Sequence, residues 1–242
     1  EKDQHAIKIG RERGIQHFAL SFANSKSDVQ LIRNLAGNES IIISKIESRG
    51  GLARLDEICN ASDALLVDRG DLSREVPLEK IPVAQKVIIS KARKLGKKAY
   101  VATNLLESMV SSSVPTRAEV NDIYNTLLDG ASGLVLAAET AIGKYPKESV
   151  VMMNNIIKSV ENDSENYNES IQMQNKHDTS ATDAITNAAY TISENAQAKV
   201  IVTFSVSGRT TLRMSRERSP VRVVGISPNI KTARKLQIAW GV

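Results

Sequence analysis

Short apolar runs, rich in β-branched residues, alternate along the chain with longer stretches in which apolar residues recur at helical spacing. Runs that are apolar almost throughout are typical of parallel strands covered on their faces. The regular alternation therefore predicts repeated βα units. The predicted strands are His17–Phe22, Ile41–Ile46, Ala64–Val67, Ala99–Ala102 and Leu134–Ala137, and the predicted helices between them are Ser27–Leu35, Leu52–Asn60, Ile81–Leu95 and Ala118–Leu128.

A polar segment rich in Asn and Glu, residues 161–178, interrupts this pattern and is predicted to be a linker. The pattern then resumes, which indicates a second α/β domain. We expect a first domain over residues 1–160 and a second over 179–242. The second contains the predicted helix Thr182–Asn195, strand Val200–Phe204, turn Ser205–Arg209, a helix to about Arg218, strand Val221–Ile226 and helix Ile230–Ala239.

Composition excludes several classes of protein. The 242 residues are 41% hydrophobic and 24% charged, as in ordinary globular proteins, and no apolar run is long enough to span a bilayer. Cys59 is the only cysteine, so there is no internal disulfide framework, and the three histidines lack metal-ligand spacing. These features predict a reduced, cytoplasmic setting.

The net charge of +5 could indicate a nucleic-acid partner, but the distribution of the charge argues against one. Lysines and arginines are spread along the chain, and their densest group, Lys91–Lys98, ends a predicted helix, where basic side chains complement the helix dipole. Aromatic residues, which stack on bases, make up only 4% of the chain. We therefore expect neither a nucleic-acid partner nor a membrane partner.

Charged residues follow two predicted strands. Lys45 and Glu47 are two residues apart at the end of one strand, so their side chains share a face. Asp71 follows the end of the next strand, and Glu47 and Asp71 together offer the oxygen ligands that Mg²⁺ or Mn²⁺ prefers. The alternative is that Glu47, Arg69 and Asp71 form surface ion pairs, and spacing alone leaves both interpretations open.

Other groups at the same strand ends suit an anionic ligand. Gly70 permits close backbone approach, and the amides after it open a helical turn that could bind a carboxylate or phosphate. Lys45 could neutralise a transferring phosphoryl group or an enolate. Thr103 also follows a strand, although in isolation it would be interpreted as an ordinary strand-end hydroxyl.

Several runs resemble pyruvate kinase, in the order and spacing of that family, over nearly the whole chain. The resemblance implies the later strands, 4 to 8, of a (β/α)8 TIM barrel followed by part of an α/β effector domain. The runs are Ile42–Glu47, Arg69–Leu72, Val101–Met109, Pro115–Glu119, Glu139–Pro146, Ser207–Thr210, Ser227–Asn229 and Thr232–Arg234.

The resemblance implies the reaction of phosphoenolpyruvate with ADP to give pyruvate and ATP, through a metal-bound enolate. Lys45 would aid phosphoryl transfer, and Glu47 and Asp71 would bind Mg²⁺ or Mn²⁺. Thr103 would assist protonation of the enolate, and Arg69, Gly70, Asp71 and Thr103 would bind substrate. It also implies a homo-oligomer.

The chain departs from the family pattern near the expected site. Asp68 replaces an alanine and adds negative charge next to the anionic end of the substrate, and Ser73 replaces a glycine. Asn24 replaces an arginine, and Ala137-Ala138 replaces a Ser-Gly pair that includes a hydroxyl associated with proton transfer. These departures favour an alternative, a weakly active or non-catalytic effector-binding paralogue.

A metal-enolate lyase or aldolase is a further alternative, although the retained Lys45 favours the kinase. The family's first three barrel strands, which carry its K⁺ ligands, and its lid domain have no counterpart in the sequence, so we expect this chain to be part of a longer protein. The loop containing Ser205, Ser207, Gly208, Arg209 and Thr210 resembles one that binds sugar phosphates. It could equally be a plain strand-to-helix turn.

Overall fold

The computed structural model describes residues 2–162 and 181–242, except residue 220. The chain forms two compact units, Glu1–Ile157 and Lys158–Val242. The predicted linker, residues 161–178, lies outside the described residues apart from its first two, which end a helix. No helix in the described ranges is long and apolar enough to cross a membrane.

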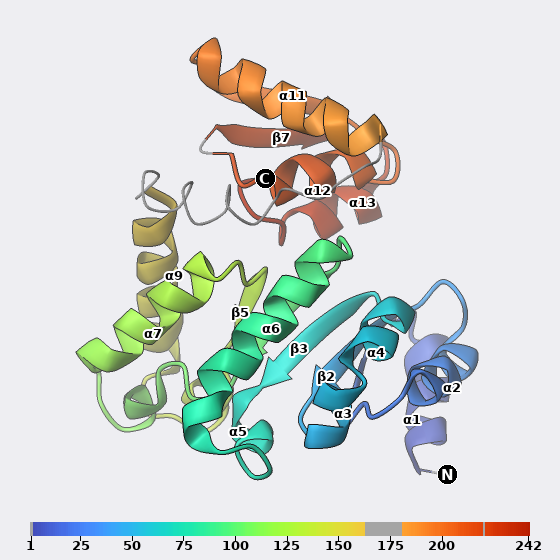
Figure 1. Cartoon of the computed structure of the whole chain (residues 1–242), viewed down its shortest axis with the longest axis vertical. Coiled ribbons are helices and arrows are strands. Elements are labelled where there is room, and N and C mark those ends of the chain that lie inside the picture. Colours follow the sequence, from blue (N-terminus) through green and yellow to red (C-terminus); the bar gives the residue numbers. More distant parts are fainter. Residues whose placement is uncertain (1, 163–180, 220) are drawn as a thin grey trace. The chain divides into compact units, whose positions relative to one another are not determined.

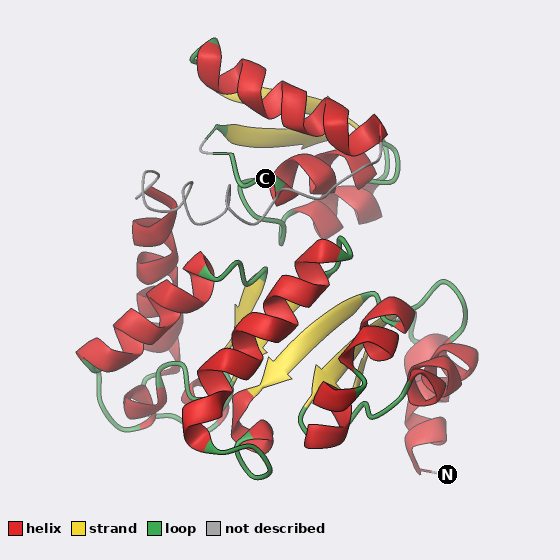
Figure 2. Ribbon diagram, in the orientation of Figure 1, coloured by secondary structure: helices red, strands yellow, loops and turns green. Residues whose placement is uncertain are grey.

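The first unit is built on a parallel sheet, as the sequence predicts (Figures 1 and 2). Its described strands follow one another across the sheet in chain order, and each pairs with the next in parallel. This arrangement is the one expected of consecutive βα units in a barrel. The strands are β1 (His17–Leu20), β2 (Ile41–Ile46), β3 (Ala64–Asp68), β4 (Lys98–Ala102) and β5 (Gly133–Val135).

Helices connect these strands, and α4 and α6 pack side by side across one face of the sheet (Figure 1). The α-helices that begin in this unit are α1 (Lys2–Glu12), α2 (Lys26–Ala36), α3 (Arg49–Ala53), α4 (Leu55–Ala61), α5 (Arg69–Leu72), α6 (Ile81–Lys94), α7 (Arg117–Leu128), α8 (Ala138–Ala141) and α9 (Pro146–Asn162). Two 3₁₀ turns, η1 (Leu78–Lys80) and η2 (Glu107–Val110), complete the set. The sequence pattern did not predict α1 or α9.

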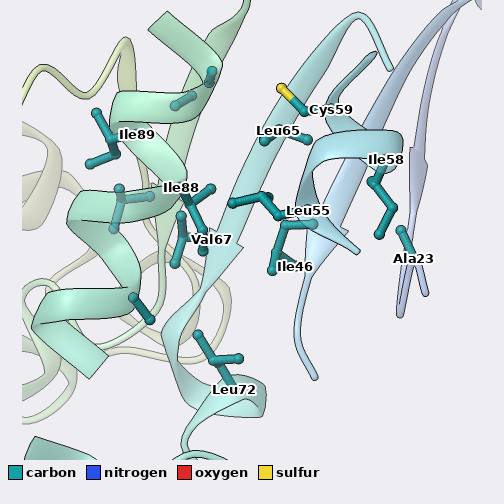
Figure 3. Close-up of a cluster of buried hydrophobic side chains, with 14 of the residues drawn as sticks. Ala23, Ile46, Leu55, Ile58, Cys59, Leu65, Val67, Leu72, Ile88 and Ile89 are labelled. Atoms are coloured by element: carbon teal, nitrogen blue, oxygen red, sulfur yellow. The ribbon is translucent and has the colours of Figure 1, made fainter. Parts of the chain in front are cut away.

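Alternate residues of each strand face the helices and form an aliphatic core (Figure 3). Ile46, Leu65 and Val67 from the strands meet Ile58 of α4 and Ile88 of α6, and all five are fully buried. Their burial supplies the main stabilising free energy of the unit, because apolar area removed from water contributes about 25 cal/mol per Å². The opposite set of strand residues, which includes Lys45, points to the other face.

The predicted helix Leu52–Asn60 is wrong in its start and its continuity. Ser48 caps an earlier helix, α3, by accepting a hydrogen bond from the amide of Gly51. The chain then breaks at Arg54, whose φ of −113° and ψ of 24° are not helical, and resumes as α4. A Cβ at Gly51 would lie 2.8 Å from the carbonyl oxygen of Ala23, so glycine permits this close approach.

The predicted strand Leu134–Ala137 also ends early. The backbone leaves the strand after Val135, and Ala137 precedes α8 with a φ of −124° and a ψ of −98°. The buried carboxylate of Glu139 holds this turn, because it accepts hydrogen bonds from the amides of Ala137 (2.8 Å) and Leu106 (3.0 Å). Buried backbone amides need such partners.

The second unit has two parallel strands, β6 (Val200–Phe204) and β7 (Arg222–Ile226), with α11 (Ala181–Asn195), α12 (Arg209–Arg216) and α13 (Ile230–Leu236). Gly208 precedes α12 with a φ of 81°, a conformation that favours glycine. A Cβ there would also lie 3.1 Å from the side chain of Thr232. The βαβ order predicted for this segment is thus confirmed.

A capping box starts α7 and fixes the loop before it. Glu119 accepts hydrogen bonds from the amides of Thr116 and Ser108, both at 2.7 Å, and from both of their hydroxyl groups. Thr116 in return accepts from the amide of Glu119. Burial alone would raise the pKa of Glu119, but these hydrogen bonds outweigh it and lower the pKa.

We predict that Glu119→Gln lowers the free energy of unfolding by about 1 kcal/mol at pH 7, because charge-assisted hydrogen bonds are lost at a partly exposed site. The folded-state pKa of Glu119 is depressed, so its contribution is present above the ordinary value of 4.5 and is lost as the pH falls below it. Urea denaturation at a series of pH values measures the difference. The exposed Glu79 of η1 provides the control, Glu79→Gln, and an equal effect of both changes would contradict the prediction.

Candidate functional site

The candidate site lies where β2 and β3 end, at the same edge of the sheet. Lys45 belongs to β2, and Glu47 follows it by two residues and so shares its face. Lys45 is opposite Leu66 in the strand register, which places Asp68 on that face as well. Asp71 comes three residues later in α5, the short helix that follows the arrowhead of β3 (Figure 1).

Lys45 forms ion pairs with two carboxylates from adjacent strand ends. Its Nζ lies 2.5 Å from Glu47 Oε1 and 3.1 Å from Asp68 Oδ2. Burial lowers the pKa of Lys45, but the two carboxylates outweigh it and the net direction is upward. The pKa of Asp68 is lowered, because the ion pair with Lys45 outweighs its burial. The Lys45 ammonium and the Asp68 carboxylate therefore stay charged at neutral pH.

Glu47 is almost completely buried, at 1% exposure. Its Oε2 accepts a hydrogen bond of 2.5 Å from the amide of Phe22, whereas Oε1 has no hydrogen bond of good geometry and forms an ion pair with the Lys45 ammonium. A buried carboxylate oxygen left in this way is available to a cation.

Three carboxylates converge at this point. Glu47, Asp68 and Asp71 each offer one oxygen, and these oxygens lie within 4.8 Å of one another. A set of hard oxygen donors of this kind fits Mg²⁺ or Mn²⁺. The sequence had assigned only Glu47 and Asp71 to a metal. Asp68 joins the cluster because it lies on the strand face shared with Lys45. Both of its oxygens already have partners, in Lys45, Thr103 and the Asp71 amide, so Glu47 and Asp71 stay the metal-ligand candidates.

Thr103 reaches the same point from the end of β4. Its Oγ1 accepts a hydrogen bond of 2.8 Å from the amide of Gly70 and lies 3.2 Å from Asp68 Oδ1 and 2.6 Å from the carbonyl oxygen of Ala102. The hydroxyl proton can be donated to either of these last two oxygens. The structure thus brings Thr103, Gly70 and Asp68 together.

Thr103 and Asn104 have φ values of 70° and 54°, in the left-handed region that non-glycine residues avoid. The Arg69 guanidinium holds them there, because it donates to the carbonyl oxygens of Thr103 (2.9 Å) and Asn104 (2.8 Å) and pairs with Asp122 at 2.6 Å. Sequence reasoning missed this role of Arg69. Its expected contact with substrate stays a prediction.

Two of the departures from the family pattern have local partners. Asn24 accepts a hydrogen bond from the Ser48 hydroxyl at 2.5 Å, and its amide group donates to the carbonyl oxygen of Phe22. Ser73 donates to the carbonyl oxygen of Gly70 at 2.8 Å. Both residues therefore stabilise the turns that carry Glu47 and Gly70.

The predicted effector loop connects β6 to α12 in the second unit. Ser207, Arg209 and Thr210 are exposed, and Gly208 is buried beneath them. The amide of Ser205 continues the sheet by donating to the carbonyl oxygen of Ile226. Exposed hydroxyl and guanidinium groups beside a helix start are compatible with a phosphate ligand. Phosphate binding there stays a prediction.

Comparison with known proteins relates both units of the chain to the same family. Residues 1–150 match the family model described as pyruvate kinase, barrel domain, and residues 183–242 match pyruvate kinase, alpha/beta domain. The chain is 40% identical over 242 residues to a pyruvate kinase of Methylorubrum extorquens, covering all of this chain and 51% of the relative.

Two further relatives come from distant organisms. A pyruvate kinase of Thermotoga maritima is 38% identical over 98% of this chain and 51% of its own length. One from Methanocaldococcus jannaschii is 36% identical over all of this chain and 54% of its own. The chain thus spans about half the length of the curated relatives it matches. The barrel-domain match alone covers more than half of the chain, and the chain therefore belongs to the pyruvate kinase family.

Proposed function

We propose that the protein transfers the phosphoryl group of phosphoenolpyruvate to ADP, giving pyruvate and ATP. The observation that carries the proposal is the gathering of Lys45, Glu47, Asp71 and Thr103 at one edge of one sheet. These residues come from the ends of three strands, as in barrel enzymes, where catalytic groups lie at the carboxyl ends of the strands.

The reaction develops negative charge on the phosphoryl group and on the enolate oxygen that it leaves. The Lys45 ammonium lies beside two of the site carboxylates, and it would stabilise the phosphoryl group in the transition state. The amides at the start of α5 would bind the substrate carboxylate. The Thr103 hydroxyl, held by Gly70 and next to Asp68, would hold the proton that the enolate takes up at its methylene carbon.

Glu47 and Asp71 would hold Mg²⁺ or Mn²⁺. When bound, the ion would supply positive charge that offsets the anionic substrate. Glu47 Oε1 supports this assignment, because this buried oxygen accepts no hydrogen bond of good geometry and could contact a metal ion beside its ion pair with Lys45. Asp71 is partly exposed and lies at the start of α5, where it could reach the same ion.

The proposed activity belongs to the whole protein, because this chain spans about half of its relatives' length. The resemblance also suggests K⁺ dependence, a homo-oligomer and a sugar-phosphate effector at Ser205–Thr210. No feature of the described residues favours the lyase or aldolase alternative, whereas Lys45 at the carboxylate cluster supports phosphoryl transfer.

The first prediction of this proposal concerns the metal. In the full-length protein, Glu47→Ala and Asp71→Ala should each weaken Mn²⁺ binding by at least about tenfold, equivalent to about 1.4 kcal/mol, because each removes one ligand. Electron paramagnetic resonance of free Mn²⁺ during a titration measures the affinity. Asp56→Ala, which removes a carboxylate that pairs with Lys91, is the control and should leave the affinity unchanged. Unchanged titrations of both site variants would refute the metal site.

The second prediction concerns phosphoryl transfer. Lys45→Met in the full-length protein should lower kcat for pyruvate formation by about 100-fold or more, because the lysine acts on charge that develops in the transition state. Mn²⁺ binding should not weaken, since the ammonium and the metal repel each other. Lys86→Met, which removes an exposed lysine paired with Asp129, serves as the control. A Lys45→Met enzyme as fast as the wild type would remove Lys45 from the mechanism.

A further inference from the structure

Three hydrogen-bond donors converge on the carboxylate of Asp68. The Lys45 ammonium lies 3.1 Å from Oδ2, and the Thr103 hydroxyl lies 3.2 Å from Oδ1. The amide of Asp71 completes the set at 3.5 Å from Oδ1, a long contact that makes Asp68 the N-cap of α5. Asp68 itself is only 7% exposed, so water competes little with these three donors for its carboxylate.

The same three donors are those that the proposed function assigns to an anionic substrate. The amides of α5 are the groups placed to receive its carboxylate, Lys45 the group for its phosphoryl end, and Thr103 the group beside the enolate. The amide of Gly70 is already bound to Thr103. A carboxylate supplied by the protein therefore occupies donors that an incoming carboxylate needs.

We propose that Asp68 is an internal competitor of the substrate, a specificity-determining carboxylate that weakens the binding of small carboxylate ligands by holding Lys45, Thr103 and the amide of Asp71. The proposal rests on the proposed function, because it concerns the substrate of that site. It differs from a purely electrostatic repulsion. Binding requires that these donors exchange one carboxylate for another, so both charge and hydrogen bonding at Asp68 oppose the ligand.

The alternative role for Asp68 is that of a positioning residue, which holds Lys45 and Thr103 in a productive arrangement. The two roles predict opposite results. Removal of a competitor strengthens ligand binding, whereas removal of a positioning residue lowers kcat and leaves ligand binding unchanged. The contacts favour competition, because the carboxylate takes up the donors directly instead of orienting them toward a separate position.

The test uses oxalate, a planar dicarboxylate that resembles the enolate of pyruvate and carries no phosphate. Isothermal titration calorimetry at saturating Mg²⁺ measures its affinity for the full-length protein. Asp68→Ala should bind oxalate at least about fivefold more tightly than the wild type. Asp68→Asn should show a smaller gain, because the amide keeps an acceptor for Thr103 and the Asp71 amide but loses the charge. Asparagine is also a good N-cap, which protects α5 if Asp68→Ala does not fold.

Asp129→Ala is the matched control. Like Asp68, Asp129 is a carboxylate paired with a lysine, Lys86, but it is half-buried and lies between α7 and β5, at the opposite end of the strands. At physiological ionic strength this change in net charge should alter oxalate affinity by less than about twofold, because distant surface charges are screened. A gain as large as that of Asp68→Ala would show a general charge effect and overturn the proposal.

Measurements of kcat and of the KM for phosphoenolpyruvate distinguish the competitor role of Asp68 from the positioning role. We expect Asp68→Ala to lower the KM for phosphoenolpyruvate by a factor similar to the change in oxalate affinity. Unchanged oxalate affinity with a lower kcat would make Asp68 a positioning residue and overturn the competition. If neither the wild type nor Asp68→Ala binds oxalate, the proposed function fails and the inference fails with it. If the wild type binds oxalate and Asp68→Ala binds it no better, only the inference fails.

Discussion

The half-buried ammonium group of Lys45 makes the candidate site possible. Three carboxylates at the ends of β2 and β3 lie within 4.8 Å of one another, and like charges at this separation repel strongly in a partly buried place. Lys45 offsets this repulsion by pairing with Glu47 and Asp68. Its long side chain extends from β2 on the same face as the carboxylates. The charge balance of the site therefore depends on the alternation of side chains along this strand.

Parallel strands bring these charges together, and the loop after β4 completes the arrangement. Arg69 starts α5 and reaches across to the carbonyl oxygens of Thr103 and Asn104, which it keeps in a left-handed conformation. Such a conformation costs of order 1–3 kcal/mol per residue and persists only where surrounding contacts determine it. The ion pair with Asp122 of α7 ties the guanidinium to a third element.

The sequence predicted what depends on local periodicity. Alternation along β2 placed Lys45 and Glu47 on one face, and the structure has them there. Features that depend on distant partners were not predictable. Arg69 pairs with Asp122, which is 53 residues away in the sequence. No local pattern indicates that Thr103 adopts a left-handed conformation.

The break of the helical stretch after Leu52 has a similar cause. A hydrophobic pattern records which residues are apolar, but not that a Cβ at Gly51 would lie 2.8 Å from the carbonyl oxygen of Ala23, where a side chain would not fit. Sequence reasoning therefore placed most of the strands and the longer helices between them, and it missed the contacts that only tertiary packing creates.

Helix α5 has only four residues, Arg69–Leu72, which is too short to form by itself in water. Its geometry is supplied by Asp68 at one end, Ser73 at the other and Thr103 across the site. The candidate anion-binding amides therefore acquire their orientation only after β4 has docked beside β3. The Gly70 amide, bonded to Thr103, should exchange its hydrogen with solvent only when that loop opens, so its exchange rate reports the local unfolding of the site as a whole.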